Sequence, residues 1–426
     1  MLWKKFEEKV TKLTAFASII LFFVVAFEIV IMISPFAFFF YSVFNPVFNW
    51  LGQFSATRWL TAFFLPHMVL PPTLFLKIIR ILGSAFFIVG AFVFITCALQ
   101  IYLGKLFRWG IADRGVYKYI RHPQYLALGI WGIGMAILWP RFIVLATLSI
   151  MFILYYFLAK DEERRMVNRY GESYEKYMRN KGMFFPTSVE RLFSSFGRII
   201  PENSLRYVVV AFFIVTTVLG SGFILRAVTL HSLLFETRSN VTILAILPED
   251  SRLNAKVIKS ILNGQEDRKI KLATDKDYLG YLMPADYIMQ GMIANTGGEF
   301  HLYKQHNTFA MISEWVLHPF QHLRSSPSFH MAKMHNVDPS IARRHHCPIE
   351  IDHSTLDCSV CPYRRVIIDE VENDYGKHIS GSGLLSFGAV RMPLYSIDIN
   401  TETGEILRIV RVKKATAWAD VPTPSI

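Results

Sequence analysis

Hydrophobic residues form long runs in the first 230 residues of the chain, whereas apolar and polar positions alternate on a finer scale in the rest. A run of about 18 or more apolar residues predicts a membrane-spanning helix. Two shorter runs parted by Pro140-Arg141 predict a tight helical hairpin. Together the pattern predicts an all-α multi-pass membrane domain over residues 1–230 with about five transmembrane helices, at residues 13–40, 74–103, 125–139, 142–158 and 208–225.

The aromatic segment 41–73 is broken by four prolines, and it fits an interfacial or re-entrant segment or a poorer sixth span. Residues 231–426 instead predict an α+β soluble domain. Within it, residues 241–247 predict a strand, and residues 253–262 predict a helix ended by Asn263-Gly264. Apolar and polar residues alternate on both sides of a turn at 400–404, which predicts a β-hairpin near the end of the chain.

Composition and charge agree with this division. Hydrophobic residues make up 52% of the chain and charged residues 18%, with a mean hydropathy of +0.33, which excludes a purely soluble protein. The net charge of +12 reflects basic loops at 105–121 and 160–200, which the positive-inside rule places in the cytoplasm. We therefore expect an integral membrane protein (of the cell or inner membrane in a bacterium). Its N-terminus is then cytoplasmic and residues 231–426 lie on the opposite face, and no nucleic-acid partner is expected because no binding motif occurs.

Two polar clusters flank the predicted hairpin. The first is Arg121-His122-Pro123-x-Tyr125, and the second begins with Glu162-Glu163 and continues through Tyr170-Gly171-x-x-Tyr174-x-x-Tyr177. Because a hairpin leaves and returns on one side of a membrane, both clusters are expected to meet at the same membrane surface. The sequence therefore predicts a site built from two helix ends.

These two clusters and Pro186 resemble the isoprenylcysteine carboxyl methyltransferase and phospholipid methyltransferase superfamily, over roughly residues 80–190. The resemblance implies a membrane enzyme that uses S-adenosylmethionine at the cytoplasmic face and takes a lipophilic methyl acceptor from the bilayer. The positions that match the family's cofactor pocket are His122, Pro123, Tyr125, Glu162 and Glu163. The Gly-x-Gly that phospholipid methyltransferases carry ahead of the His-Pro element has no clear match here.

The residue types suit such a cofactor. Glu162 and Glu163 offer carboxylates for an ammonium group and ribose hydroxyls, Arg121 or His122 offers a base for a carboxylate, and Tyr125 offers an aromatic wall. Methyl transfer requires the nucleophile and the methyl group to be held at near-attack distance in a dry site. Arg121, His122 and Glu163 are the predicted catalytic residues, with His122 or Glu163 assisting a nucleophile that must lose a proton.

Each cluster also has a purely structural interpretation. Arg121-His122 fits an interfacial anchor, and Glu162-Glu163 followed by two arginines fits a solvated helix with local ion pairs. The tyrosines at 170, 174 and 177 fall on one face of a helix, where packing or interfacial anchoring is the favoured interpretation. Gly171 permits a close approach or a helix break.

Ten of the thirteen histidines and three of the four cysteines lie between residues 301 and 378. Thiolates and imidazoles are the usual ligands of zinc, and they also bind haem iron. Cys347, His353, Cys358 and Cys361 are the candidate metal ligands. A disulfide involving Cys358 and Cys361, or unpaired structural thiols, are the alternatives in an extracytoplasmic domain.

The sequence thus favours an integral-membrane S-adenosylmethionine-dependent methyltransferase that acts on a lipophilic substrate at the cytoplasmic face. The alternative is a non-enzymatic membrane scaffold whose soluble domain handles metal, haem or redox chemistry. A transporter is disfavoured because paired charges within the predicted spans are scarce. The methyl acceptor stays open among a prenylated cysteine carboxylate, a lipid amine, a small thiol and a quinone-like phenol.

Overall fold

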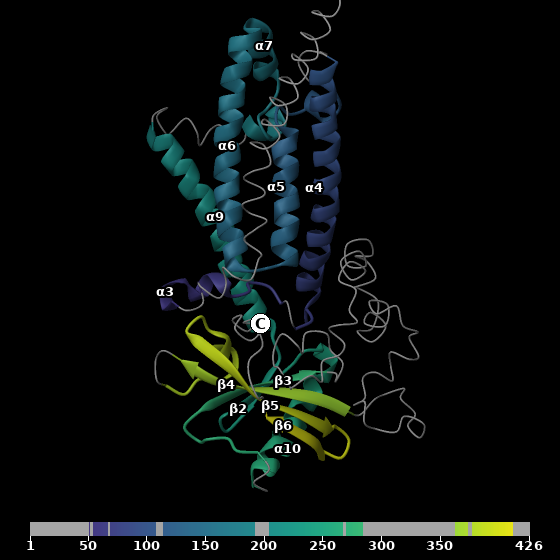
Figure 1. The fold of residues 1–426 in the computed structure, drawn as a ribbon, viewed down its shortest axis with the longest axis vertical. Coiled ribbons are helices and arrows are strands. Elements are labelled where there is room, and N and C mark those ends of the chain that lie inside the picture. The colour runs from purple at the N-terminus through teal and green to yellow at the C-terminus, as the bar shows by residue number, and fades with distance from the viewer. Residues whose placement is uncertain are drawn as a thin grey trace, which may run out of the picture. The chain divides into compact units, whose positions relative to one another are not determined.

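The computed structural model describes residues 51, 54–66, 69–107, 114–191, 204–266, 270–283, 363–373 and 377–411 (Figure 1). The described chain belongs to two compact units. The first contains residues 86–133 and 146–218, and the second contains residues 44–85, 134–145 and 219–426. The predicted span at 13–40 and the predicted ligands Cys347, His353, Cys358 and Cys361 lie outside the described residues. The division into domains at residue 230 stays a prediction.

Long apolar helices form where the hydrophobic runs predict them. They are α4 (Leu74–Leu106), α5 (Pro123–Leu138), α6 (Phe142–Tyr170) and α9 (Ser204–Ser232). The segments Leu74–Gly104, Phe142–Tyr170 and Tyr207–Ser232 are each long and apolar enough to cross a membrane, whereas Pro123–Leu138 is shorter. The structure therefore supports a multi-pass helical membrane part, with three such candidate spans among the described residues.

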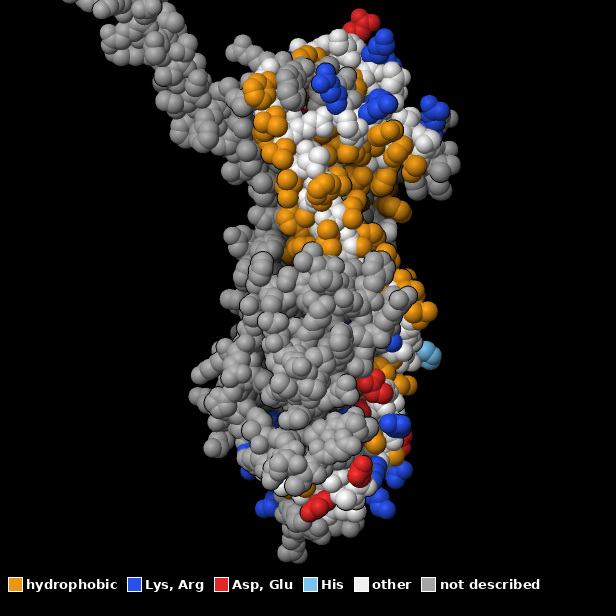
Figure 2. Space-filling model, turned by 90° about the vertical axis from the view of Figure 1, so that its right-hand side faces the viewer, with side chains coloured by type: hydrophobic (Ala, Val, Ile, Leu, Met, Phe, Trp, Pro, Cys, Tyr) orange, Lys and Arg blue, Asp and Glu red, His pale blue; other side chains and the backbone are white. Residues whose placement is uncertain are grey.

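On the face shown in Figure 2, apolar side chains cover much of the described surface of the long helices. Phe92 on α4 and Phe212 on α9 are each 70% exposed. Apolar side chains exposed in this number are stable when lipid surrounds them and are unfavourable in water. Lysine and arginine side chains gather at the end of the helices near α7, as expected for a helix end outside the hydrocarbon region (Figures 1 and 2).

Helix α6 continues well past residue 158, where the predicted span ended. Its last turns are rich in helix-favouring Lys, Glu, Arg and Met, and Asp161 pairs with Arg164 and with Arg165, the latter at 3.1 Å. A helix of 29 residues is about 43 Å long, which exceeds a hydrocarbon core of about 30 Å. The polar last turns, with Glu162 and Glu163, therefore extend the hairpin beyond its apolar part.

The chain breaks at Gly171, between α6 and α7 (Glu172–Asn180). Gly171 has a φ of 55°, a conformation that glycine adopts readily and other residues rarely do. The prediction that Tyr170, Tyr174 and Tyr177 share one helical face is wrong, because this break separates Tyr170 from the two tyrosines of α7. The alternative prediction of a helix break at Gly171 is confirmed.

Shorter helices complete the helical part. They are α3 (Ser55–Arg58), η1 (Trp59–Thr61) and η2 (Gly115–Lys118). Residues 54–66 thus hold a short helix followed by an extended segment in which Phe63 pairs with Arg141, and this described stretch contains no helix as long as the candidate spans. The interfacial prediction for this part of residues 41–73 fits this geometry.

The second unit contains a six-stranded mixed sheet with strand order β1-β2-β3-β4-β5-β6. Strands β2 and β3 are parallel and are connected through α10, and all other neighbours are antiparallel. The remaining short helices are η3, before α10, and η5, before β5. The bounds are β1 Phe235–Arg238, β2 Val241–Ala245, η3 Pro248–Leu253, α10 Asn254–Glu266, β3 Asp277–Met283, β4 Tyr363–Asn373, η5 Gly381–Leu385, β5 Ala389–Asn400 and β6 Ile406–Arg411.

The sheet confirms the predicted strand, helix and hairpin, and therefore an α+β fold for this part of the chain. In the hairpin turn, the Gly404 amide donates to the Asn400 carbonyl at 2.8 Å, and the Asn400 side chain accepts from the amides of Glu402 and Thr403. One boundary differs, because α10 runs through Asn263-Gly264 to Glu266. A glycine inside a helix costs only about 1 kcal/mol, which the packing of this helix on the sheet offsets.

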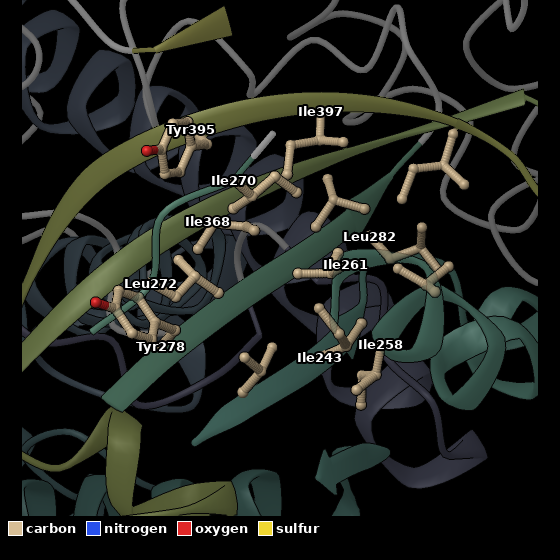
Figure 3. Packing of buried hydrophobic residues seen from close by; sticks show 14 of the residues in the cluster. Ile243, Ile258, Ile261, Ile270, Leu272, Tyr278, Leu282, Ile368, Tyr395 and Ile397 are labelled. Atoms are coloured by element: carbon tan, nitrogen blue, oxygen red, sulfur yellow. The ribbon is translucent and has the colours of Figure 1, made fainter. Parts of the chain in front are cut away.

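Both faces of the sheet are buried. On one face, isoleucines of α10 and of the strands interdigitate around Ile243, Ile258 and Ile261 (Figure 3). On the other face, the core includes Tyr281, Ile367 and η5 residues Leu384 and Leu385. Burying one such side chain contributes about 1.5–3 kcal/mol, so these two cores are the main source of stability of the sheet.

Candidate functional site

The two predicted polar clusters meet in the first unit. His122 directly precedes α5, and its carbonyl accepts from the Leu126 amide at 3.2 Å, so it starts the helix. Its Nε2 lies 3.3 Å from Glu163 Oε1 and its Nδ1 lies 3.5 Å from Glu162 Oε2. Arg121 Nε lies 3.0 Å from Glu163 Oε1. The expected convergence of the start of α5 and the end of α6 is therefore confirmed.

An aromatic stack lies beside the carboxylates. The rings of His122 and Tyr125 are stacked with centroids 5.6 Å apart, and those of Tyr125 and Tyr155 are stacked with centroids 4.9 Å apart. The Tyr125 hydroxyl donates to Glu162 Oε2 at 3.3 Å. The site therefore combines flat apolar ring faces with negatively charged groups.

The two adjacent glutamates differ in their exposure. The side chain of Glu163 is 4% exposed, and the same carboxylate oxygen faces both Arg121 and His122. The side chain of Glu162 is 34% exposed. Glu163 is therefore a buried counter-ion of the cluster, whereas Glu162 presents its carboxylate at the rim of the site.

The electrostatic environment favours a protonated His122. Burial alone would lower the pKa of His122, but the hydrogen bonds and the negative charges of Glu162 and Glu163 outweigh burial and raise this pKa above its usual value. A protonated imidazole donates from both ring nitrogens, which matches the two carboxylates that face it.

The chain after α7 holds the backbone of the first cluster. The Arg121 amide donates to the Gly182 carbonyl at 2.9 Å, and the His122 amide donates to the Met183 carbonyl at 3.0 Å. At Gly182 a Cβ atom would lie only 1.9 Å from the Phe185 carbonyl oxygen, so the tight turn requires glycine. The Glu190 side chain closes this turn by accepting from the amides of Phe184 and Phe185.

Pro123 is the first residue of α5, where its fixed φ and missing N–H suit a helix start. Its observed role is to set the direction of the helix that carries Tyr125. Whether Pro123 also contacts a cofactor stays a prediction.

Three further residues of this region were not indicated by the sequence, and a fourth, Tyr177, was assigned there only to a packing or interfacial stripe. Tyr155 lies seven residues before Glu162 on α6, a spacing that places both on one helix face and that could have indicated it. Tyr117, Gln124 and Tyr177 form a hydrogen-bonded chain that ties three segments together. Their contacts join residues up to 60 positions apart, so no local pattern indicates them.

Within the described ranges, no group of three or more His, Cys, Asp or Glu side chains is arranged to hold a metal ion. The predicted ligands Cys347, His353, Cys358 and Cys361 fall outside those ranges. The zinc, haem and disulfide predictions therefore stay predictions. The fourth cysteine, Cys97, is a buried free thiol on α4.

Comparison with known proteins bears on the stretch that carries the site. Residues 108–168 match the isoprenylcysteine carboxyl methyltransferase family. The resemblance to this superfamily is thereby confirmed for a stretch that contains Arg121, His122, Tyr125, Glu162 and Glu163.

One similar protein is the Protein-S-isoprenylcysteine O-methyltransferase of Schizosaccharomyces pombe (strain 972 / ATCC 24843). It is 36% identical to this chain over 66 residues, which are 15% of this chain and 27% of the relative. The match thus spans about a quarter of the relative's length. No solved structure matches the chain.

Proposed function

We propose that the protein is an integral-membrane methyltransferase that uses S-adenosylmethionine and methylates a lipophilic acceptor. The observation that carries this proposal is the convergence of His122, Tyr125 and the two glutamates at adjoining ends of α5 and α6. Their stretch is also the one that matches the methyltransferase family. S-adenosylmethionine, when bound, supplies a methyl group on a positively charged sulfur.

The residues present fit this cofactor chemically. The stacked, buried rings of His122, Tyr125 and Tyr155 form an aromatic wall beside the carboxylates, of the kind that an adenine ring packs against. The partly exposed carboxylate of Glu162 offers an acceptor for an ammonium group or for ribose hydroxyls. We assign Glu162 to direct contact with the cofactor, and Glu163 to holding Arg121 and His122 in place.

The same geometry bears on the acceptor. His122 faces carboxylates with both ring nitrogens, and its raised pKa favours the charged form, so it is a poor general base. An acceptor that is already a nucleophilic anion needs no proton removed by this side chain. A lipophilic carboxylate is therefore the acceptor that the cluster suits best among the four classes left open by the sequence. The name of the yeast relative, an isoprenylcysteine O-methyltransferase, agrees with this choice.

We propose further that the site faces the cytoplasm and that the sheet lies on the other side of the membrane. The stretches before α5 and at the end of α6 and through α7 are rich in basic residues, at 118, 160, 164, 165, 176, 179 and 181, as the positive-inside rule expects of cytoplasmic segments. Helix α9, which precedes β1 in the chain, is one continuous helix of 29 residues, long enough to cross a bilayer.

Calorimetric titration of the detergent-purified full chain with S-adenosylhomocysteine tests the proposal. Wild-type protein is expected to bind saturably. Glu162→Gln is expected to weaken binding by about tenfold to a hundredfold, because a charge-assisted hydrogen bond to the ligand is worth about 1.5–3 kcal/mol. Asp161→Asn, an exposed acid one position earlier on the same helix, is the matched control and should bind as wild type.

Two results would overturn the proposal. One is a well-folded wild-type protein that does not bind S-adenosylhomocysteine. The other is binding that Glu162→Gln and Asp161→Asn affect equally, since that would place the ligand elsewhere. Either result would direct attention to the alternative of a membrane scaffold.

A further inference from the structure

A chain of buried hydrogen bonds fastens α7 to the start of α5. The Tyr177 hydroxyl on α7 donates to the Tyr117 carbonyl at 2.9 Å. The Tyr117 hydroxyl in turn donates to Gln124 Oε1 at 3.0 Å, and Tyr117 and Gln124 are 3% and 2% exposed. Gln124 lies between Pro123 and Tyr125 in the first turn of α5. The position of α7 is thus linked to the helix turn that carries the site.

Arg121 connects the same helix to the carboxylates. Its Nη1 donates to the Met178 carbonyl in the last turn of α7 at 3.1 Å, while its Nε lies 3.0 Å from Glu163 Oε1. A cation at this end of a helix is favoured by the carbonyls that point outward there. One guanidinium is therefore shared between the end of α7 and the buried acid of the site.

The other end of α7 begins directly after the backbone break at Gly171. Gly171 has φ 55° and ψ −133°, and no atom lies within 4 Å of the place where a Cβ would sit. The backbone conformation, and not close packing, is the reason for glycine at this position. Helix α7 places Tyr174 inward, where it is 4% exposed, and leaves Glu172, Ser173, Glu175 and Lys176 in solvent.

We propose that α7 is a closing element of the cofactor site, which turns about Gly171 and is fastened by Tyr177. Tyr177 is then a positioning residue, and Arg121 transmits the charge state of the site to α7. This inference rests on the proposed function, because the ligand that favours the closed position is the cofactor. A cation bound beside Glu162 and Glu163 changes the field at Arg121, and with it the bond from Arg121 to the Met178 carbonyl.

Hydrogen–deuterium exchange of the full chain, with and without S-adenosylhomocysteine, tests the proposal. In wild-type protein the ligand should slow exchange of the amides at 175–181. Tyr177→Phe removes one hydrogen bond, so exchange of these amides in ligand-free protein should rise and affinity should fall, each by about fivefold. Tyr170→Phe, which removes a hydroxyl on the other side of the hinge, is the matched control and should change neither quantity.

A second variant distinguishes a positioning role of Tyr177 from a general loss of folded structure. Gly171→Ala strains the hinge while leaving the contacts of Tyr177 and Arg121 intact. It should also change α7 exchange and weaken binding, with exchange in α5 and α6 unaltered. A purely structural role for Tyr177 would instead raise exchange throughout α5, α6 and α7 and leave the ligand-induced slowing in place.

The outcomes separate this inference from the proposed function. Saturable binding by wild type, with no slowing at 175–181 and with Tyr177→Phe equal to Tyr170→Phe, overturns the closing element alone. Failure of wild type to bind overturns both. Binding together with slowing that Tyr177→Phe diminishes supports both.

Discussion

Two groups of buried charged side chains, one in each unit, have different kinds of partner. In the first unit, Arg121 and His122 face the carboxylates of Glu162 and Glu163 at 3.0–3.5 Å. These four side chains pair with one another, Arg121 donates in addition to the Met178 carbonyl, and Glu162 is partly exposed. Such a cluster can exchange one partner for a ligand while the others keep their positions.

In the second unit, two buried arginines bind the main chain. Arg141 donates to the Thr61 carbonyl and lies 4.2 Å from the Phe63 ring centroid. Arg226 donates to the carbonyls of Phe63 and Leu385, and lies 4.5 Å from the centroid of the Phe387 ring. The bonds of Arg226 join three segments that are far apart in the sequence. These segments are α9, η5 and the residues that directly follow η1.

The difference indicates what each group of charges does. Carbonyls belong to the backbone and cannot leave without unfolding it, so Arg141 and Arg226 act as fixed ties between segments. Side-chain carboxylates can rotate and respond to a ligand. Arg141 and Arg226 thus stabilise the fold of the second unit. Under our proposal, the charged cluster of the first unit binds the cofactor.

The largest expected effect on the free energy of unfolding comes from removing the hydrogen bonds of a buried arginine in the second unit. Arg226→Met leaves buried carbonyls unsatisfied, so it should lower the free energy of unfolding by about 3 kcal/mol or more. Thermal unfolding in detergent measures this effect. Arg238→Met, at a side chain that is 52% exposed, is the control and should change little. Equal stabilities of the two variants would contradict the comparison.

A buried acid in the second unit sharpens the comparison. Asp369 on β4 is fully buried, and neither of its carboxylate oxygens has a hydrogen-bond partner among the residues that the structure describes. Burial raises the pKa of Asp369 to about 8, although the charge of Arg391 lowers it in part. The buried hydroxyl of Tyr281 also lies in the field of this carboxylate.

Because this pKa is raised on folding, the native state binds a proton that the unfolded state releases above pH 4. Stability should therefore fall as the pH rises from about 4 to 8, by about 1.4 kcal/mol per pH unit in the middle of that window. Denaturant unfolding between pH 5 and 7 should give a shallower pH slope for Asp369→Asn than for wild type. Asp275→Asn, at an exposed residue, should keep the wild-type slope; equal slopes for all three proteins would refute the prediction.

A smaller, pH-dependent effect is expected at the cluster of the first unit. The raised pKa of His122 means that its contribution to the free energy of unfolding is complete below about pH 6.5 and is lost as the pH rises through the native pKa. The free energy of unfolding should therefore fall at alkaline pH, by at most about 1.4 kcal/mol per pH unit. His122→Gln should abolish this step, whereas His231→Gln on α9 should retain it. Thermal unfolding in detergent across this pH range makes the comparison.

The smallest effect concerns the aromatic stack. Tyr155→Leu removes a ring that stacks on Tyr125, and such a contact is worth about 0.5–1.5 kcal/mol, so ligand affinity should fall about twofold to tenfold. Tyr155→Phe keeps the ring and should bind as wild type. Equal weakening by both variants would assign the effect to the hydroxyl and not to stacking.

Much of the fold follows from local patterns. The apolar runs predict α4, α5, α6 and α9 because each segment satisfies its backbone hydrogen bonds by itself. The turn residues around Asn400 predict the hairpin of β5 and β6 for a similar local reason. The pairing of β3 with β4 joins distant parts of the chain, and no pattern within either strand specifies that partner.

The candidate site was predictable in part. Arg121, His122 and Tyr125 follow one another closely, and a hairpin of apolar helices is enough to bring them near the acids of α6. The sequence pattern assigned Tyr177 to a packing stripe because it assumed one continuous helix. The break at Gly171 changes which residues share a helix face. Its bond to Tyr117 depends on how α7 folds back.

The sequence by itself determined that a basic and an acidic cluster lie at adjoining helix ends, because helix length and hairpin geometry leave little choice. It could not distinguish Glu162 from Glu163, which are neighbours of the same chemical type. A helix turns by about 100° per residue, so only the packing of α5 and α7 against α6 decides which carboxylate is buried against Arg121 and which reaches the rim. Tertiary structure also decided that Arg226 would bind carbonyls, since those carbonyls come from segments distant in the chain.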